Sequence, residues 1–271
     1  MTSAQIKNSF SSIGEVDAGI APSSLVLKLS FSNDAVRYFV SSITHSQIIF
    51  FGNYTLHYIN QASELAQRLE KIFEKDEILQ LPFAKVLIGV NTNYSLVPDE
   101  FSFMINRLDQ LTNRIDQTEL VFECSDQVVS VLKKQYSGFE LIHLSSTFLK
   151  VLPKYNSENG ERLFVNVGPN YLDIIRFDSL NRLKLLNRYS YEAATDFIYY
   201  VLLCCEELSI NRETTELLLI GEVDIQSKIY DLCYRYFRHI SFIQKPEEVN
   251  FSKAFDIFPK HLHFNLYNLS L

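Results

Sequence analysis

Two histidines near the carboxyl end of the sequence come closest to a metal-binding motif. His261 and His263 are separated by one residue, so on a β-strand both imidazoles would point to one face, continued by Asn265 and Tyr267. A zinc site needs at least three protein ligands, and no other His or Cys lies nearby in the sequence. We therefore interpret this segment as the solvated polar face of a terminal strand, and we expect no metal site.

Residues that could act as acids, bases or nucleophiles are scattered along the chain. The remaining histidines are isolated: His45, His57, His143 and His239. Three pairs of carboxylates are adjacent in sequence: Asp99–Glu100, Glu206–Glu207 and Glu247–Glu248. Neighbouring side chains on a helix point in different directions, so these pairs do not form acid–base sites. The Gly-x-Ser-x-Gly motif of serine hydrolases is absent, and we predict no catalytic residues.

One predicted helix combines aromatic and basic side chains. The chain contains 15 Tyr and 21 Phe, and Tyr230, Tyr234 and Tyr236 share this helix with Arg235 and Arg238. Tyr and Arg together are typical of the residues that dominate protein–protein interfaces. Alternatively, Tyr230 and Tyr234 cover a sheet with their rings. Because one face of the helix must pack on the sheet, we favour the core interpretation.

The composition is that of a folded protein. The chain has 271 residues, of which 47% are apolar and 21% charged, with only 8 Gly and 7 Pro, and this excludes disorder as its main state. The 25 basic and 32 acidic residues give a formal net charge of −7, which argues against general nucleic-acid binding. Arg235, Arg238 and His239 form the densest basic group.

Apolar runs are too short for a membrane protein. The longest, Phe197–Cys205, has nine residues, whereas a membrane-spanning helix needs about 20. Residues 1–24 lack an apolar core, so we expect no signal peptide. The four cysteines form no Cys-x-x-Cys pair, and Cys204–Cys205 lie in an apolar stretch. These observations predict a cytoplasmic protein with reduced, buried thiols.

Apolar periodicity divides the chain into three parts. Residues 1–23 are predicted to be a weakly structured leader, followed by a first α/β half (24–155) and a second (156–271) that meet at the polar stretch 155–161. For the first half we predict strands at 25–31, 35–40, 47–51, 84–90, 119–123 and 139–143, with helices at 62–77, from Pro98, at 126–136 and at 148–152. For the second half we predict strands at 162–167, 171–177, 182–188, 216–220 and 240–243, with helices at 193–208 and 224–238.

The two halves repeat one pattern. Shifted by 136 positions, Ser30–Arg37 falls on Asn166–Asp173, and the first three strands of the halves align. Each half has the order β-β-β-α-β-α-β. Because parallel strands need crossover helices, this order predicts a mixed sheet with helices on its faces in each half.

This duplicated order resembles the actin-like ATPase fold, the duplicated ribonuclease-H-like fold of actin, sugar kinases and pilus-assembly ATPases. Four stretches more narrowly resemble an uncharacterised Bacteroidetes family, domain of unknown function 3822: Leu96–Pro98, Phe164–Gly168, Asp196–Tyr200 and Leu217–Gly221. The resemblance covers residues 24–271. It implies a fold and no established activity.

The resemblance also implies where a nucleotide would bind. Proteins of this fold hold ATP between their halves with two Asp-x-Gly-[Ser/Thr] turns and a later Gly-Gly turn. The first turn corresponds to Ser30–Asn33, which lacks both the acid and the glycine. The second corresponds to Asn166–Pro169, which keeps Gly168 but has an amide in place of the acid, and its Pro169 has no N–H to donate.

The third turn offers a single glycine, Gly221, and the charge of the following Glu222 would repel a phosphate. Asn166, Gly168 and Gly221 are therefore the candidate cofactor-binding residues. The missing acids predict a pseudo-ATPase that needs no cofactor and does not hydrolyse ATP. Two-metal nuclease chemistry, found in related single-domain proteins, is excluded because the strand at 25–31 has no acid.

We therefore expect a non-catalytic protein-interaction or scaffold module, whose partner is an unidentified protein or a second copy of itself. The alternative is a nucleotide-binding switch that holds ATP with magnesium, or another phosphate ligand, through Asn166, Gly168 and Gly221.

Overall fold

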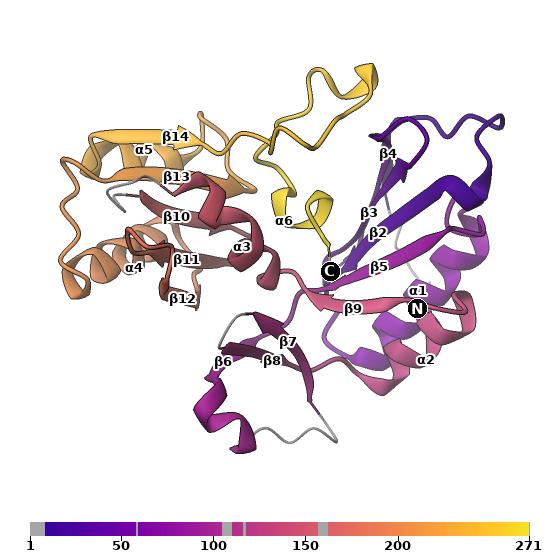
Figure 1. Cartoon of the computed structure of the whole chain (residues 1–271), viewed down its shortest axis with the longest axis horizontal. Coiled ribbons are helices and arrows are strands. Elements are labelled where there is room, and N and C mark those ends of the chain that lie inside the picture. The colour runs from indigo at the N-terminus through magenta and orange to yellow at the C-terminus, as the bar shows by residue number, and fades with distance from the viewer. Residues whose placement is uncertain (1–8, 58, 105–109, 116–117, 157–161, 271) are drawn as a thin grey trace, which may run out of the picture. The chain divides into compact units, whose positions relative to one another are not determined.

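A computed structural model of the chain describes residues 9–57, 59–104, 110–115, 118–156 and 162–270 (Figure 1). The chain forms two compact units. Unit 1 comprises Met1–Thr147, Glu247–Ile257 and Leu266–Leu271, and unit 2 comprises Phe148–Pro246 and Phe258–Asn265. None of the helices among the described residues has the length and apolar character needed to span a membrane.

Unit 1 is built on a six-stranded mixed sheet. In order across the sheet, its strands are β1 (Ser9–Gly14), β4 (Gln47–Thr55), β3 (Ala35–Ser42), β2 (Leu25–Phe31), β5 (Lys85–Val90) and β9 (Glu140–His143). The pairs β1–β4, β4–β3 and β3–β2 are antiparallel, whereas β2–β5 and β5–β9 are parallel. The parallel pairs require crossover connections, which contain α1 (Ala62–Lys75) and α2 (Asp126–Gln135).

Two consecutive residues of β3 show what covers each face of this sheet. Tyr38 and Phe39 are both fully buried, and neighbouring residues in a strand point to opposite faces. The Tyr38 hydroxyl donates to Oδ2 of Asp76, just after α1, at 2.6 Å. The Phe39 ring contacts those of Phe251 and Tyr267, with centroids 6.5 and 5.9 Å apart. The carboxyl-terminal segments of unit 1 therefore cover the face opposite α1.

A small antiparallel sheet is inserted between β5 and α2. Its strands, in order, are β6 (Tyr94–Pro98), β8 (Thr118–Phe122) and β7 (Leu111–Ile115). The helix expected from Pro98 is only a 3₁₀ helix at Asp99–Met104, with residues 105–109 outside the described residues. The strand expected at 119–123 belongs to this small sheet and not to the main one. The short β6 is mostly half-buried, so it has no clean apolar alternation from which it could be predicted.

Unit 2 contains a five-stranded mixed sheet. In order, its strands are β12 (Leu183–Ser190), β11 (Tyr171–Phe177), β10 (Arg162–Val167), β13 (Glu216–Gly221) and β14 (His239–Phe242). Helices α4 (Ala194–Glu207) and α5 (Lys228–Tyr236) contribute Phe197, Val201 and Cys233 to a core shared with strand residues such as Leu163 and Leu217. Two short helices, α3 (Ser146–Val151) and α6 (Phe264–Tyr267), each contain a point where the chain passes between units.

The predicted repeat is present in the strand pairing. Ser30 pairs with Arg37 in β2–β3, and Asn166 pairs with Asp173 in β10–β11, at positions 136 residues further along. The third strands begin at Gln47 and Leu183, which preserves the same offset. With β6–β8 as an insertion, both units have the order β-β-β-α-β-α-β.

Three expectations, two about the ends of the chain and one about the boundary between its halves, differ from the structure. Residues 9–14 of the supposed leader form edge strand β1, paired with β4, and their mostly exposed side chains gave no signal for it. Residues 261–265, expected as a strand, form a turn at 261–263 and the first residues of α6. The unit boundary lies after Thr147 instead of near residue 155, and residues 247–257 and 266–271 return to unit 1 because aromatic side chains there pack on its sheet.

A buried lysine ties the returning segment to the sheet. Lys28 of β2 donates from Nζ to the carbonyl oxygen of Tyr267 at 2.6 Å. Burial, and to a smaller extent the positive charge of Lys85, lower the pKa of Lys28 to about 8. The folded protein therefore loses this proton well below the pH at which the unfolded chain does.

We predict that Lys28→Met removes a component of stability that depends on pH. Because the unfolded chain holds the extra proton above pH 8, the stability of the wild type relative to the variant should rise by about 2 kcal/mol between about pH 7 and about pH 9.5. Urea denaturation of both proteins across this range measures the difference between their free energies of unfolding. Tyr and Cys titrate in both proteins, so their contributions cancel in this difference. A constant difference would contradict the assignment.

Candidate functional site

The candidate residue Asn166 lies in a buried polar ladder across three strands. Asn166 of β10 faces Asp173 of β11, which faces Arg188 of β12. Asn166 donates from Nδ2 to Oδ2 of Asp173 at 3.0 Å. Arg188 donates to the same carboxylate from Nε at 2.8 Å and from Nη2 at 3.1 Å. Asp173 has no exposed surface, so this carboxylate is held by an amide and a guanidinium within the protein.

The turn at Gly168 is closed by two tyrosines. The N–H of Gly168 donates to the carbonyl of Tyr171 at 2.8 Å, and the Tyr191 hydroxyl donates to the carbonyl of Gly168 at 2.6 Å. A Cβ atom at Gly168 would lie 2.3 Å from the Tyr171 ring. The guanidinium carbon of Arg188 stands 4.1 Å from the centroid of that ring. The turn is therefore filled by side chains of its own unit.

Gly221 ends β13 beside the same turn. Its φ of +86° belongs to the left-handed region that favours glycine, and a Cβ there would lie 2.3 Å from the carbonyl oxygen of Val167. The N–H of Gly221 donates to the carbonyl of His261 at 2.9 Å, and that of Glu222 to the carbonyl of Val167 at 2.7 Å. Burial, and then the nearby Glu222 carboxylate, raise the pKa of Tyr191. A negative charge thus lies close to the turn.

The structure brings the three candidate residues together. Asn166 and Gly168 lie on one strand end, and Asn166 Oδ1 lies 2.7 Å from the position of a Cβ on Gly221. The sequence did not identify Arg188 and Tyr171, which complete the cluster. Asp173, the one carboxylate in the mostly apolar strand Tyr171–Phe177, was the available signal, because a buried carboxylate requires a partner.

The corresponding turn of unit 1 is also closed internally. The N–H of Ser32 donates to the carbonyl of Ala35 at 2.9 Å, and the Ser32 hydroxyl donates to Oδ1 of Asp34 at 2.6 Å. The carbonyl of Asn33 accepts from the N–H of Ile59 at 2.9 Å. Asp34 is therefore a turn-stabilising carboxylate in this unit.

His261 and His263 contact different neighbours. His261 stacks on Phe242, with ring centroids 4.3 Å apart, and its Nε2 lies 2.9 Å from the carbonyl oxygen of Val223. Burial lowers the pKa of His261. His263 has a positive φ of 53°, and its ring lies 6.4 Å from that of Phe258. The two imidazoles thus pack on different aromatic neighbours and do not continue one strand face.

Helix α5 divides the tyrosines between core and surface. Tyr230 stacks on Phe242 with centroids 5.6 Å apart, as the core interpretation predicts. Tyr234 is 71% exposed, so that interpretation is wrong for this residue, and Tyr236 is 42% exposed. The four cysteines are free, and burial raises the pKa of Cys205 to about 11 and that of Cys233 to about 12. These thiols stay protonated at neutral pH.

The family model described as "Protein of unknown function (DUF3822)" matches residues 21–240. The chain belongs to this family. None of the curated proteins matches it. A structure from Bacteroides thetaiotaomicron, described as having an actin-like ATPase fold and unknown function, is 17% identical with a TM-score of 0.67, covering 82% of this chain and 91% of that one. The DUF3822 chain therefore has the actin-like ATPase fold, as its sequence predicted.

Two further structures resemble the DUF3822 chain more weakly. The ethanolamine utilization protein EutJ from Carboxydothermus hydrogenoformans is 9% identical with a TM-score of 0.49, covering 83% of this chain and 86% of that one. The AlfA filament structure from a B. subtilis plasmid is 9% identical with a TM-score of 0.46, covering 90% and 97%.

We predict that Gly221→Ala destabilises the protein by at least about 2 kcal/mol, because the new Cβ would meet a backbone carbonyl in a left-handed conformation. Gly138→Ala is the matched control, since a Cβ at Gly138 meets nothing within 4 Å. Urea denaturation of the two variants measures the difference. Equal stabilities would show that the strand end at Gly221 is not constrained as described.

We predict that restoring the acid of the second turn, by Asn166→Asp, weakens the fold. Two carboxylates would face each other where the amide now donates at 3.0 Å, so one pKa of the pair would rise. The loss should be about 2–4 kcal/mol near neutral pH and smaller near pH 5, where the pair holds a proton.

The exposed Asn187→Asp on β12 is the control for that substitution, and we expect it to change stability by less than about 0.5 kcal/mol. Chemical denaturation at both pH values measures each variant against the wild type. An Asn166→Asp variant as stable as the wild type near neutral pH would refute the role given to the ladder.

Proposed function

We propose that this DUF3822 protein is a non-catalytic interaction module that uses the actin-like ATPase fold as a scaffold. One observation carries the proposal: the groups expected to receive a phosphate are engaged within unit 2. The N–H groups of Gly168, Gly221 and Glu222 each donate to a backbone carbonyl, at 2.8, 2.9 and 2.7 Å. A phosphate at these amides would have to replace three internal hydrogen bonds.

The side chains around the turns do not fit a nucleotide with magnesium. Asn166 has no charge to offer a cation, and the Asp173 carboxylate is engaged by Arg188 at 2.8 Å. The Tyr171 ring fills the space beside Gly168, where a phosphate would need close backbone approach. Within the described ranges, no cluster of three or more His, Cys, Asp or Glu could hold a metal ion. These features support a pseudo-ATPase without a cofactor.

A nucleotide-binding switch is the second candidate. Its support is the convergence of Asn166, Gly168 and Gly221 at the ends of the neighbouring strands β10 and β13, with a glycine of positive φ among them. That arrangement would accept ATP or another phosphate ligand only after Tyr171 and the internal hydrogen bonds rearranged. We place the protein, in either role, in the cytoplasm, where its four free thiols stay reduced.

Titration calorimetry of the whole chain with ATP, ADP and GTP, with and without magnesium, separates the two candidates. The interaction-module proposal predicts no saturable heat up to millimolar nucleotide. Saturable binding that is lost in a folded Gly168→Val variant would overturn it in favour of the switch. Thermal unfolding of the variant checks that any loss is not caused by misfolding.

A further inference from the structure

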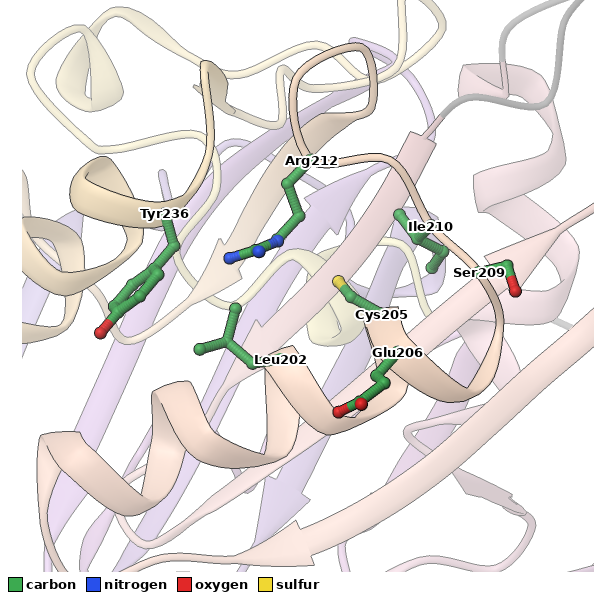
Figure 2. Close-up of a pocket in the computed structure, with 7 residues that line it drawn as sticks. All are labelled: Leu202, Cys205, Glu206, Ser209, Ile210, Arg212 and Tyr236. Atoms are coloured by element: carbon green, nitrogen blue, oxygen red, sulfur yellow. The ribbon is translucent and has the colours of Figure 1, made fainter.

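A groove in unit 2 lies away from the phosphate turns. Its larger part is a cavity of about 590 Å³ between the end of α4 and the last turn of α5, and it includes Leu202, Cys205, Glu206, Arg212 and Tyr236 (Figure 2). A second cavity of about 330 Å³ shares Arg212 and Tyr236 and adds Arg235. We call the two together the α4–α5 groove. We propose that this groove binds an acidic segment of a partner protein. The proposal rests on the function proposed above and names its binding surface.

The backbone fixes the position of Arg212. After α4, the N–H of Ile210 donates to the carbonyl of Cys205 at 2.7 Å, and Ser209 has a positive φ of 52°, which turns the chain sharply. The carbonyl of Arg212 then accepts from the N–H of Arg238, just beyond α5, at 3.2 Å. The loop is thus tied to both helices, which holds the backbone of Arg212 beside the groove.

Two arginines line the groove without a carboxylate partner among the described residues. Arg212 and Arg235 have no carboxylate within 4 Å and no side-chain hydrogen bond in the described part of the chain. By contrast, Arg162 and Arg188 make ion pairs at 2.8 Å. In Figure 2 the Arg212 side chain extends into the space between Tyr236 and Cys205. In a chain with a net charge of −7, these two cations create a local site for negative charge.

The groove also offers apolar contact. Its floor includes Cys205 and Ile210, both buried, while Leu202 and the half-exposed Tyr236 ring lie on its walls. The guanidinium carbon of Arg212 is 6.0 Å from the centroid of the Tyr236 ring. An Arg beside a partly exposed Tyr, over an apolar floor, is the composition of an interface hot spot.

The charges around the groove determine where the carboxylate of a ligand would bind. Glu206 lies on the α4 wall, so a ligand carboxylate would be drawn toward Arg212 and Arg235 and away from that wall. Glu213, at the far end, is partly neutralised by Arg238, 3.9 Å away. A peptide with an Asp or Glu next to an aliphatic or aromatic side chain matches both the cations and the floor. The acidic net charge of the protein disfavours a long polyanion such as nucleic acid.

The experiment selects peptides from a phage-displayed random 12-residue library on the whole chain, then measures one selected peptide by fluorescence anisotropy. We expect the enriched peptides to carry Asp or Glu beside a large apolar residue. Arg212→Glu with Arg235→Glu should raise the Kd at least tenfold, and salt should weaken binding to the wild type. The matched control, Lys71→Glu with Lys133→Glu, makes the same charge change at exposed sites of unit 1 and should leave the Kd unchanged.

Enriched peptides without acidic residues, a selection that enriches nothing, or equal binding to the charge-reversed variant would each overturn the groove proposal. If that variant unfolds early in a thermal scan, Arg212→Gln with Arg235→Gln replaces it. The outcome of the calorimetry described above does not depend on the peptide experiment. Nucleotide binding would overturn the interaction-module proposal and leave the peptide result intact. Failure of peptide binding would overturn the groove proposal and leave the closed phosphate turns unaffected.

Discussion

The buried carboxylate of Asp173 sets the requirements that the rest of unit 2 meets. A charge with no exposed surface is tolerated only when it is paired and hydrogen-bonded, and Arg188 and Asn166 supply these contacts from the strands on either side. The ladder fixes the register of β10, β11 and β12 at one point. It also places Arg188 over Tyr171, whose ring fills the turn at Gly168. The contacts that stabilise this sheet therefore also close the turn.

Internal hydrogen bonds also satisfy the backbone at the strand ends where we expected a phosphate to bind. In unit 2, the N–H groups at the strand ends pair with carbonyls from the turn itself and from the segment near His261. In unit 1, the serine turn at residues 30–33 is satisfied by its own neighbours. Backbone groups that a phosphate would otherwise satisfy are thus satisfied by the protein. Internal hydrogen bonds thus stabilise these turns, and this is why we propose that an exposed surface, the α4–α5 groove, binds a partner.

Much of this fold could be predicted from the sequence because its main elements are locally encoded. Apolar strands and amphipathic helices define both β-β-β-α-β-α-β patterns, and the offset of 136 residues between Ser30 and Asn166 holds in the strand pairing. The edge strand β1 and the small sheet could not be predicted, because their side chains are mostly exposed or lack alternation. The return of residues 247–257 to unit 1 depends on long-range aromatic contacts to Phe39, which no local pattern records.

The candidate site, too, could be predicted from the sequence only in part. The residue types at Asn166, Gly168 and Gly221 predict a degenerate phosphate site; the structure brings the three residues together, and their role in phosphate binding stays a prediction. Their neighbours Tyr171 and Arg188 could not be assigned, since the pairing of β11 with β12 decides which side chains face the turn. The sequence indicated the α4–α5 groove only in part, through the Tyr and Arg residues of α5. Arg212 joins them through the loop after α4, which has no periodic pattern.

Hydrogen exchange at single amides tests the central claim most directly. Nuclear magnetic resonance can follow the N–H groups of Gly168, Gly221 and Glu222 with and without millimolar magnesium-ATP. If these groups are engaged internally, they exchange slowly in the free protein, and the nucleotide leaves their rates unchanged. Fast exchange in the free protein, slowed when the nucleotide is added, would show that the turns are open phosphate sites and would contradict the account.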